Sequence, residues 1–302
     1  MNILVTGACG QLGHEMQLQA AQNPQHSWFF TDVVTSAPAT DQVGGVFVTV
    51  SPLDITDRSA ILDFVDAHEI DIIVNCAAFT AVDRAESEPE KAHLLNATAP
   101  GYLAAAIEHR GGHLIHISTD YVFDGTAHIP YTEDQPPCPV SVYGRTKLAG
   151  EKAVLAENPS AMIIRSAWLY SRFGNNFVKT MLRLGQERSE LGVIFDQIGT
   201  PTYARDLAAT IMTAINNGIV PGIFHFSDEG VCSWYDFTLA IHRLADITTC
   251  HVRPLHTAEY PTPASRPHYG VLDKSKIKAT FGIKIPHWEA SLEKCIKELM
   301  TD

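Results

Sequence analysis

The stretch that decides the fold is Ile3-Leu4-Val5-Thr6-Gly7-Ala8-Cys9-Gly10-Gln11-Leu12-Gly13, near the start of a chain of 302 residues. Its first apolar residues have the composition of a short strand buried in a parallel sheet. Three glycines follow, and the amphipathic segment from Gln11 to Ala21 predicts a helix. Glycines allow a tight turn close to a pyrophosphate, and the free N–H groups of a helix N-terminus attract its charge. This order predicts a dinucleotide-binding loop that uses Gly7, Gly10, Gln11, Leu12 and Gly13. The alternative is a glycine turn that merely joins a strand to a helix.

An acidic residue ends the next predicted strand, which runs from Ser27 to Asp32. Asp32 follows Gly13 by 19 residues, close to the spacing of about 20 at which an acid accepts hydrogen bonds from the adenosine ribose. The sequence between Gly13 and Arg58 contains no Lys or Arg that could neutralise a 2′-phosphate. This pattern favours NAD(H) over NADP(H). The alternatives are a cation supplied from a distant part of the sequence, and an ordinary acid in a strand-end turn.

Small or polar residues follow the next predicted strands. Asp54 and Ile55 come where a strand-like segment gives way to a helix, a position suited to contact with an adenine. The strand from Asp71 to Asn75 runs into Ala77, Ala78 and Thr80, where small side chains permit close approach to a cofactor. Ligands of doubly wound sheets bind beyond the carboxyl ends of the strands. We therefore expect cofactor contacts from Asp54, Ile55, Ala77, Ala78 and Thr80.

The alternation of strands and helices predicts an α/β fold with a doubly wound parallel sheet, which is a Rossmann-like domain. After Trp168 the pattern loosens, which predicts a smaller carboxy-terminal α/β lobe for the substrate. We expect residues 1–168 and 191–221 to form the dinucleotide-binding domain, and residues 169–190 and 222–302 to form the substrate-binding lobe. The length of the chain suffices for this division.

Tyr143 and Lys147 are one turn apart in the predicted helix from Val142 to Ala156, so they share a face. A free phenol has a pKa of ~10, which a nearby ammonium lowers because it stabilises the phenolate. Carbonyl reduction needs a group that protonates the new alkoxide as the hydride arrives, and Tyr143 fits that role. Lys147 can also bind the nicotinamide ribose, and Thr119, at a predicted strand end, can donate to the carbonyl oxygen. The alternative is a solvated Tyr–Lys pair on a helix surface.

These residues resemble the extended short-chain dehydrogenase/reductases, whose hallmark is G-x-x-G-x-x-G with Y-x-x-x-K. The resemblance is closer to the dTDP-4-dehydrorhamnose reductase family and covers at least residues 1–245. One block carries Cys76 in place of an alanine, and another is a variant of R-x-S-W-x-Y. The matching blocks are residues 10–13, 75–86, 118–125, 143–151, 165–170, 174–182 and 196–202.

The resemblance implies a catalytic triad of Thr119, Tyr143 and Lys147. It also implies that NADH or NADPH reduces the 4-keto group of dTDP-4-dehydro-L-rhamnose, or of a similar nucleotide sugar, with dTDP-L-rhamnose as the product. Members of this family often bind Mg²⁺ at a dimer contact. In this chain the resemblance implies Glu15 and Glu190 as ligands, and a homodimer.

Several residues are candidates for the pocket of the nucleotide sugar. Trp168, after the predicted strand from Ala161 to Arg165, can line the pocket or pack in a core. Arg266 lies in an extended loop with several prolines, where a guanidinium can bind a diphosphate through two hydrogen bonds. The alternative for Arg266 is a surface arginine. The other candidates are Val82, Thr119, Tyr121, Asn176 and Gln197.

Two other functions stay open at this point. A nucleotide-sugar epimerase uses the same triad with tightly held NAD, and copurification of stoichiometric NAD would favour it. Some relatives of these reductases are non-catalytic regulatory subunits, which keep the dinucleotide site and bind a partner enzyme. The intact Tyr143–Lys147 pair favours catalysis but does not decide against this role.

Composition restricts the partners. The net charge of −12 argues against nucleic acid or an anionic membrane. Six cysteines show no C-x-x-C pairing, and fourteen histidines show no zinc-ligand spacing. The sequence enters a strand at once, without an apolar signal segment or a run of membrane-spanning length. We expect a cytoplasmic enzyme with free thiols.

Overall fold

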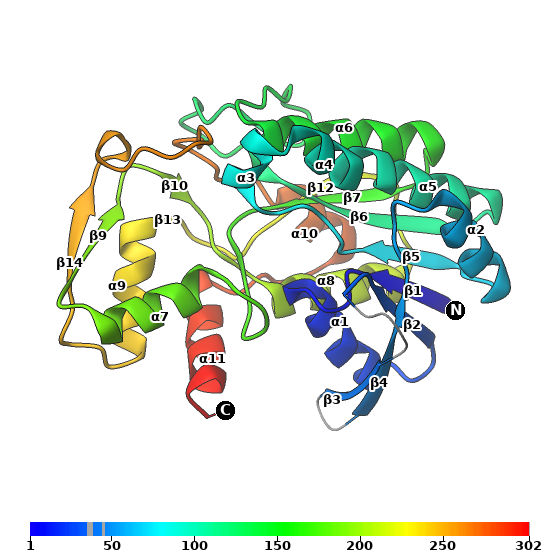
Figure 1. Ribbon diagram of the computed structural model, residues 1–302, viewed down its shortest axis with the longest axis horizontal. Coiled ribbons are helices and arrows are strands. Elements are labelled where there is room, and N and C mark those ends of the chain that lie inside the picture. Colours follow the sequence, from blue (N-terminus) through cyan, green and yellow to red (C-terminus); the bar gives the residue numbers. More distant parts are fainter. Residues whose placement is uncertain (35–38, 44–45, 302) are drawn as a thin grey trace.

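The computed structural model describes residues 1–34, 39–43 and 46–301. Figure 1 shows a large sheet with helices on both faces, and a smaller lobe beside it that holds β9, β14, α7 and α9. Within the described ranges, none of the helices combines the length and apolar character needed to cross a membrane.

Eight strands of the described residues form the main sheet, and all neighbours are parallel except β3, which runs antiparallel to β4. The order reverses between β1 and β5, where doubly wound sheets bind their ligands. The predicted Rossmann-like fold is therefore confirmed. The strands in spatial order are β12 (Gly222–Phe226), β7 (Met162–Ser166), β6 (His113–Thr119), β5 (Ile72–Asn75), β1 (Asn2–Thr6), β2 (Ser27–Asp32), β4 (Val46–Pro52) and β3 (Ala39–Val43).

Alternate side chains of the central strands supply two hydrophobic cores, one on each face. Ile3 and Val5 of β1 face one core, whereas Leu4 faces the other, and all three are fully buried. Burial on both faces explains why this strand is a continuous apolar run and not an alternating one. The helices of the first face are α1 (Gln11–Gln22), α8 (Ala204–Asn217) and α10 (Ser275–Phe281), and those of the second are α2 (Arg58–Ala67), α5 (Ala99–His109) and α6 (Val142–Glu157).

The helices begin where the sequence provides caps. Asp57 accepts hydrogen bonds from the backbone N–H groups of Ser59 and Ala60 and starts α2.

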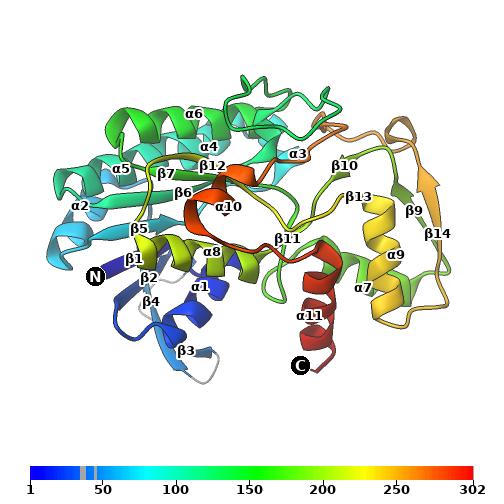
Figure 2. The same cartoon turned by 180° about the vertical axis from the view of Figure 1, so that it is seen from behind.

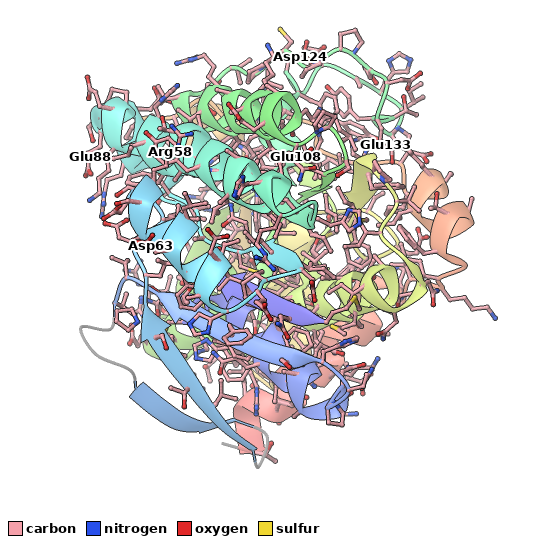
Figure 3. The ribbon with its side chains drawn as sticks, turned by 90° about the vertical axis from the view of Figure 1, so that its right-hand side faces the viewer. Arg58, Asp63, Glu88, Glu108, Asp124 and Glu133 are labelled. Atoms are coloured by element: carbon pink, nitrogen blue, oxygen red, sulfur yellow. The ribbon has the colours of Figure 1, made fainter. Side chains whose placement is uncertain are left out.

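In Figure 3, Asp63 and Glu108 lie on the outer surface of the helices that cover the second face. Two short helices, α3 (Val82–Ser87) and α4 (Pro89–His93), precede a π-helical turn that leads into α5.

The smaller lobe has its own core, which includes Phe237, Trp288 and Leu292. Figure 2 shows α11 descending beside α8, so the last helix lies next to the main domain. The elements of this lobe and of its junction are β8 (Leu169–Tyr170), α7 (Phe177–Glu187), β9 (Glu190–Ile194), β10 (Ile198–Gly199), β11 (Thr202–Tyr203), β13 (Cys232–Ser233), α9 (Trp234–Leu244), β14 (His251–Leu255) and α11 (Trp288–Thr301).

The structure divides the chain differently from the predicted boundaries. Strand β12 and helix α10, which the prediction assigns to the lobe, pack in the main domain, because β12 pairs with β7 and α10 joins the first core. Strand β9, assigned to the main domain apart from its first residue, pairs with β14 in the lobe. These pairings connect residues far apart in sequence, so local patterns carry no sign of them.

Candidate active site

A cavity of about 760 Å³ lies at the carboxyl ends of the central strands and extends to the start of α7 and α9. A second surface hollow, beside Arg58 and Tyr102, contains none of the residues predicted for the site. Among the described residues that line the larger cavity, Lys147 is the sole lysine or arginine. The predicted site residues in its lining are Gly7, Gly10, Gln11, Leu12, Asp32, Asp54, Ile55, Ala77, Ala78, Thr80, Val82, Thr119, Tyr121, Tyr143, Lys147, Trp168 and Asn176.

Two glycines of the loop have steric reasons for lacking a side chain. Gly7 has a φ of +66°, and a Cβ atom there would lie 2.6 Å from the backbone nitrogen of Ala77. Gly13 does not line the cavity, but its Cβ would lie 2.6 Å from the Cα of Ala8. Gly7 thus permits the turn, and Gly13 lets α1 pack against the loop. The first turn of α1 consequently directs backbone N–H groups toward the cavity, as an anion site requires.

The carboxylate of Asp32 is tied to this loop. One of its oxygens accepts a hydrogen bond from the backbone N–H of Cys9 at 2.9 Å, and the other accepts from the N–H of Val34 at 3.1 Å. Asp54 is held in a similar way, because its Oδ1 accepts from the N–H and hydroxyl of Thr56. Two fixed negative charges therefore line the part of the cavity where the prediction places the adenosine.

Tyr143, Lys147 and Thr119 come together at the junction of α6 and β6. Ser141 caps α6 by accepting a hydrogen bond from the N–H of Gly144 at 3.1 Å. Lys147 is 2 % exposed, and its Nζ donates to the backbone oxygen of Ile117 at 2.7 Å. The Thr119 hydroxyl lies within hydrogen-bonding reach of the Tyr143 phenol. The arrangement places a phenol, a hydroxyl and an ammonium at one wall of the cavity.

The ionisation of this group differs from the sequence-based expectation. Burial raises the pKa of Tyr143 to about 12, while the Thr119 hydroxyl acts in the opposite direction. Burial also lowers the pKa of Lys147 to about 8, against the opposing charge of Glu151. The expected lowering of the Tyr143 pKa by the ammonium does not occur in this structure, because desolvation of the phenolate dominates. Tyr143 consequently keeps its proton at neutral pH.

A buried ion pair lies behind Lys147. Glu151, one turn after Lys147 on α6, accepts hydrogen bonds from Arg165 at 2.9 and 2.7 Å and from the Ser118 hydroxyl at 2.5 Å. Both charged side chains are 2 % exposed. Asn96, in the π-helical turn before α5, holds the backbone of Phe79 through two hydrogen bonds. This polar layer fixes α6 against the sheet.

The substrate side of the cavity is aromatic. Trp168 has a φ of +48°, a backbone conformation rare for a bulky residue. Its indole stacks on that of Trp234 with ring centroids 3.5 Å apart, and a Cβ at Gly199 would lie 2.7 Å from its other side. Strain at a cavity wall is typical of functional sites. Trp234, Phe177 and Phe237 also line the cavity, although none of them is among the residues predicted from sequence. The start of α9 directly after Ser233 was the available signal for Trp234.

Asn176 connects the two sides of the cavity. Its Oδ1 caps α7 by accepting from the N–H of Lys179, and its Nδ2 donates to the Oε1 of Gln11 at 3.0 Å. Gln11 is the first residue of α1, beside the glycine loop. A residue predicted for the substrate therefore contacts a residue predicted for the cofactor.

Two predicted substrate residues do not line the cavity. The guanidinium of Arg266 forms two hydrogen bonds with the carboxylate of Asp83, at 2.7 and 3.1 Å, and reaches the Tyr121 hydroxyl. Gln197 is buried and donates to Thr257 at 3.1 Å. Arg266 lies behind Tyr121, whereas Gln197 belongs to the packing of the lobe.

The two predicted magnesium ligands are not brought together. Glu15 is fully buried in α1, where it accepts hydrogen bonds from Ser171 and Arg205. Glu190 is 61 % exposed on β9 and lies 3.8 Å from Arg253. Within the described ranges, no group of three His, Cys, Asp or Glu side chains has the arrangement of a metal site. The charge of Glu15 is balanced by a guanidinium, so the prediction of magnesium here does not fit the structure.

A family model and known proteins match this chain over essentially its whole length. A family model described as RmlD substrate binding domain matches residues 1–301. The chain belongs to this family. The dTDP-4-dehydrorhamnose reductase of Escherichia coli K12 is 40 % identical over 310 residues, which cover 100 % of this chain and 99 % of the relative.

Solved structures of family members share the fold over nearly the full length. The dTDP-4-dehydrorhamnose reductase of Clostridium acetobutylicum is 43 % identical, with a TM-score of 0.90 over 99 % of this chain and 100 % of that one. The Bacillus anthracis reductase, solved in complex with NADP, is 36 % identical, with a TM-score of 0.87 over 98 % and 99 %. The RmlD family therefore accounts for the whole chain, including the lobe.

Proposed function

We propose that this chain is an NAD(P)H-dependent oxidoreductase that reduces the 4-keto group of dTDP-4-dehydro-L-rhamnose to give dTDP-L-rhamnose. The observation that carries the proposal is the meeting of Thr119, Tyr143 and Lys147 at one wall of a cavity that runs from the glycine loop to the aromatic lobe. Membership of the RmlD family and the names of its relatives support the nucleotide sugar as the substrate.

The residues divide the chemistry between them. A bound NADH or NADPH would supply the hydride, and the N-terminus of α1 would hold its pyrophosphate. Thr119 and Tyr143 orient the keto oxygen by donating hydrogen bonds to it, and Tyr143 gives its proton to that oxygen as the negative charge develops. Lys147, with its ammonium held at the oxygen of Ile117, would bind the nicotinamide ribose of that cofactor.

We also propose a preference for NADH over NADPH. The carboxylate of Asp32, fixed by the N–H groups of Cys9 and Val34, lies where the adenosine ribose is expected. A second phosphate at the 2′ position would bring negative charge toward this carboxylate. Both cofactors remain substrates in the proposal. The cytoplasmic location and the homodimer stay predictions, and magnesium has no part in the proposed reaction.

The test is oxidation of reduced cofactor by the pure protein with dTDP-4-dehydrorhamnose, followed by absorbance. We expect turnover with both cofactors, faster with NADH at low concentration. Tyr143→Phe removes the acid and should lower kcat by about 10²- to 10⁴-fold. Tyr260→Phe, which changes an exposed tyrosine outside the cavity, is the matched control.

Two results would overturn the proposal. Equal rates for wild type and Tyr143→Phe would remove the proposed acid. Copurification with stoichiometric NAD, together with no consumption of added reduced cofactor, would favour an epimerase.

A further inference from the structure

A buried carboxyl group beside Thr119 has no part in the proposed reaction so far. Asp120 follows Thr119 directly, belongs to the cavity lining and is 3 % exposed. Its Oδ1 accepts a hydrogen bond from the Thr119 hydroxyl at 3.0 Å. Its Oδ2 faces the backbone of Gly270, where a Cβ atom would lie 2.5 Å away. The carboxyl therefore lies between Thr119 and the loop that contains Gly270.

This carboxyl lacks the partner that a buried charge normally needs. In the part of the chain that the structure describes, no lysine, arginine or histidine forms an ion pair with Asp120. By contrast, Glu151 is paired with Arg165, and Asp83 is paired with Arg266. A buried carboxyl without a cation avoids the desolvation penalty by holding a proton. When Asp120 holds this proton on Oδ1, its hydrogen bond with Thr119 reverses, so that the carboxyl donates to the hydroxyl and the hydroxyl can pass a proton on.

The Asp120 carboxyl, the Thr119 hydroxyl and the Tyr143 phenol form a chain of neighbouring groups. Thr119 contacts Asp120 on one side and lies within hydrogen-bonding reach of Tyr143 on the other. We propose that Asp120 supplies, through the hydroxyl of Thr119, the proton that restores Tyr143 after each turnover. The inference rests on the proposed reduction, because it concerns the acid of that reaction.

The proton balance is simple. Hydride and the Tyr143 proton together convert the keto group to an alcohol and leave a phenolate. Thr119 then gives its hydroxyl proton to this phenolate and takes the Asp120 proton in exchange. The Asp120 carboxylate regains a proton from solvent when the product has left the cavity. Asp120 therefore acts on the reaction only through Thr119.

The surroundings of Asp120 favour transfer in this direction. Burial raises the pKa of Asp120 to about 7, against the hydrogen bond from Thr119, and burial raises that of Tyr143 to about 12. A proton therefore passes readily from the carboxyl to the phenolate. Two other titratable groups lie close to Asp120. Tyr121 is the next residue in the chain, and the guanidinium of Arg266 contacts the Tyr121 hydroxyl. Arg266 is itself paired with Asp83.

The experiment compares the first turnover with later turnovers. Tyr143 carries its proton before the first reaction, so Asp120→Asn should oxidise one equivalent of reduced cofactor per site at the wild-type rate. Later turnovers should be slower by about tenfold or more, because the amide has no proton to supply. Rapid mixing of enzyme and cofactor with nucleotide sugar, followed by absorbance, separates the two phases.

The pH dependence gives a second readout. Since Asp120 must be protonated to act, wild-type kcat should fall as the pH rises through about 7. Asp120→Asn should lack this decline. Asp134→Asn is the matched control, because Asp134 also accepts a hydrogen bond from a threonine but lies on an exposed loop outside the cavity. Gly270→Ala keeps the carboxyl but crowds it, and should show the same two-phase behaviour if Asp120→Asn does not fold.

Two results would overturn the relay. Equal slowing of the first and later turnovers in Asp120→Asn would indicate a structural role, and unchanged rates in both phases would indicate none. Absence of turnover in wild type would contradict the proposed function instead, so the two failures are distinguishable.

Discussion

The two sides of the cavity are built in different ways. The cofactor side consists largely of backbone, with glycines and alanines at contact distance, and its residues come from the first half of the chain. The substrate side is lined by large side chains that already have partners: Trp168 is stacked on Trp234, and Tyr121 contacts Arg266, which lies outside the cavity and is paired with Asp83. The cofactor side is therefore preformed, whereas a ligand on the substrate side must compete with contacts within the protein.

The largest effect is expected where the backbone has no room. Gly7→Ala places a Cβ 2.6 Å from the Ala77 nitrogen at a φ of +66°, so it should weaken NADH binding by about a hundredfold, equivalent to about 3 kcal/mol. Gly111→Ala is the matched control, because Gly111 has a φ of +69° but open space around it. Titration of cofactor fluorescence measures both. Similar losses in the two variants would mean that backbone strain alone, and not close packing, matters at Gly7.

A smaller effect is expected where a side chain must exchange partners. If the substrate diphosphate takes Arg266 from Asp83, Arg266→Met should raise the substrate KM about tenfold, equivalent to about 1.4 kcal/mol. Asp83→Asn should lower the KM, because it frees the guanidinium. Steady-state kinetics at saturating cofactor give both values, and the cofactor Kd should not change. A KM that neither variant moves would restrict Arg266 to holding the loop on α3.

The smallest effect concerns the junction between the main domain and the lobe, where Asp228 follows β12 and contacts β11. Asp228 is fully buried, its Oδ2 accepts from the N–H of Tyr203, and its Oδ1 has no hydrogen-bond partner among the described residues. Burial raises the pKa of Asp228 to about 8, so the folded protein binds a proton that the unfolded chain, with a pKa near 4, has released. This contribution to stability is complete at acidic pH and is lost as the pH rises through about 8.

Asp228→Asn should remove that dependence, because an amide does not titrate. Between pH 7 and pH 8 the free energy of unfolding of wild type should fall by about 1 kcal/mol relative to the variant. Urea unfolding at a series of pH values measures the difference. Parallel curves for the two proteins would show that Asp228 does not change its protonation on unfolding.

The contrast between the two sides also explains what the sequence could predict. Gly7, Gly13 and Asp32 follow from strand and helix patterns within a short segment, and Tyr143 and Lys147 follow from one helical turn. By contrast, Arg266 and Asp83 are 183 positions apart, and Arg205 and Glu15 are 190 apart. No local pattern reveals which acid a distant arginine pairs with. The sequence therefore could not show that Asp83 already binds Arg266, or that Arg205 binds Glu15, where magnesium was predicted.

The ionisation of Tyr143 belongs to the same class of property. Its neighbours in the helix suggest a lowered pKa, but its burial depends on how the lobe and the sheet enclose it. The same holds for Trp234, which joins the lining because α9 starts at the cavity wall. Patterns in sequence therefore located the chemistry, whereas tertiary packing determined the charge and access of each group.

The stacked indoles of Trp168 and Trp234 have an optical consequence. Two indole rings with centroids 3.5 Å apart couple their excited states, so their circular dichroism depends on how one ring is oriented relative to the other. The other two tryptophans have different ring partners, since Trp28 stacks on Phe30 and Trp288 lies edge-on to Phe237. Any sugar nucleotide that separates or tilts the two rings would change this signal. The protein thus carries an intrinsic spectroscopic probe of its own substrate lobe, readable without a label or a coupled reaction.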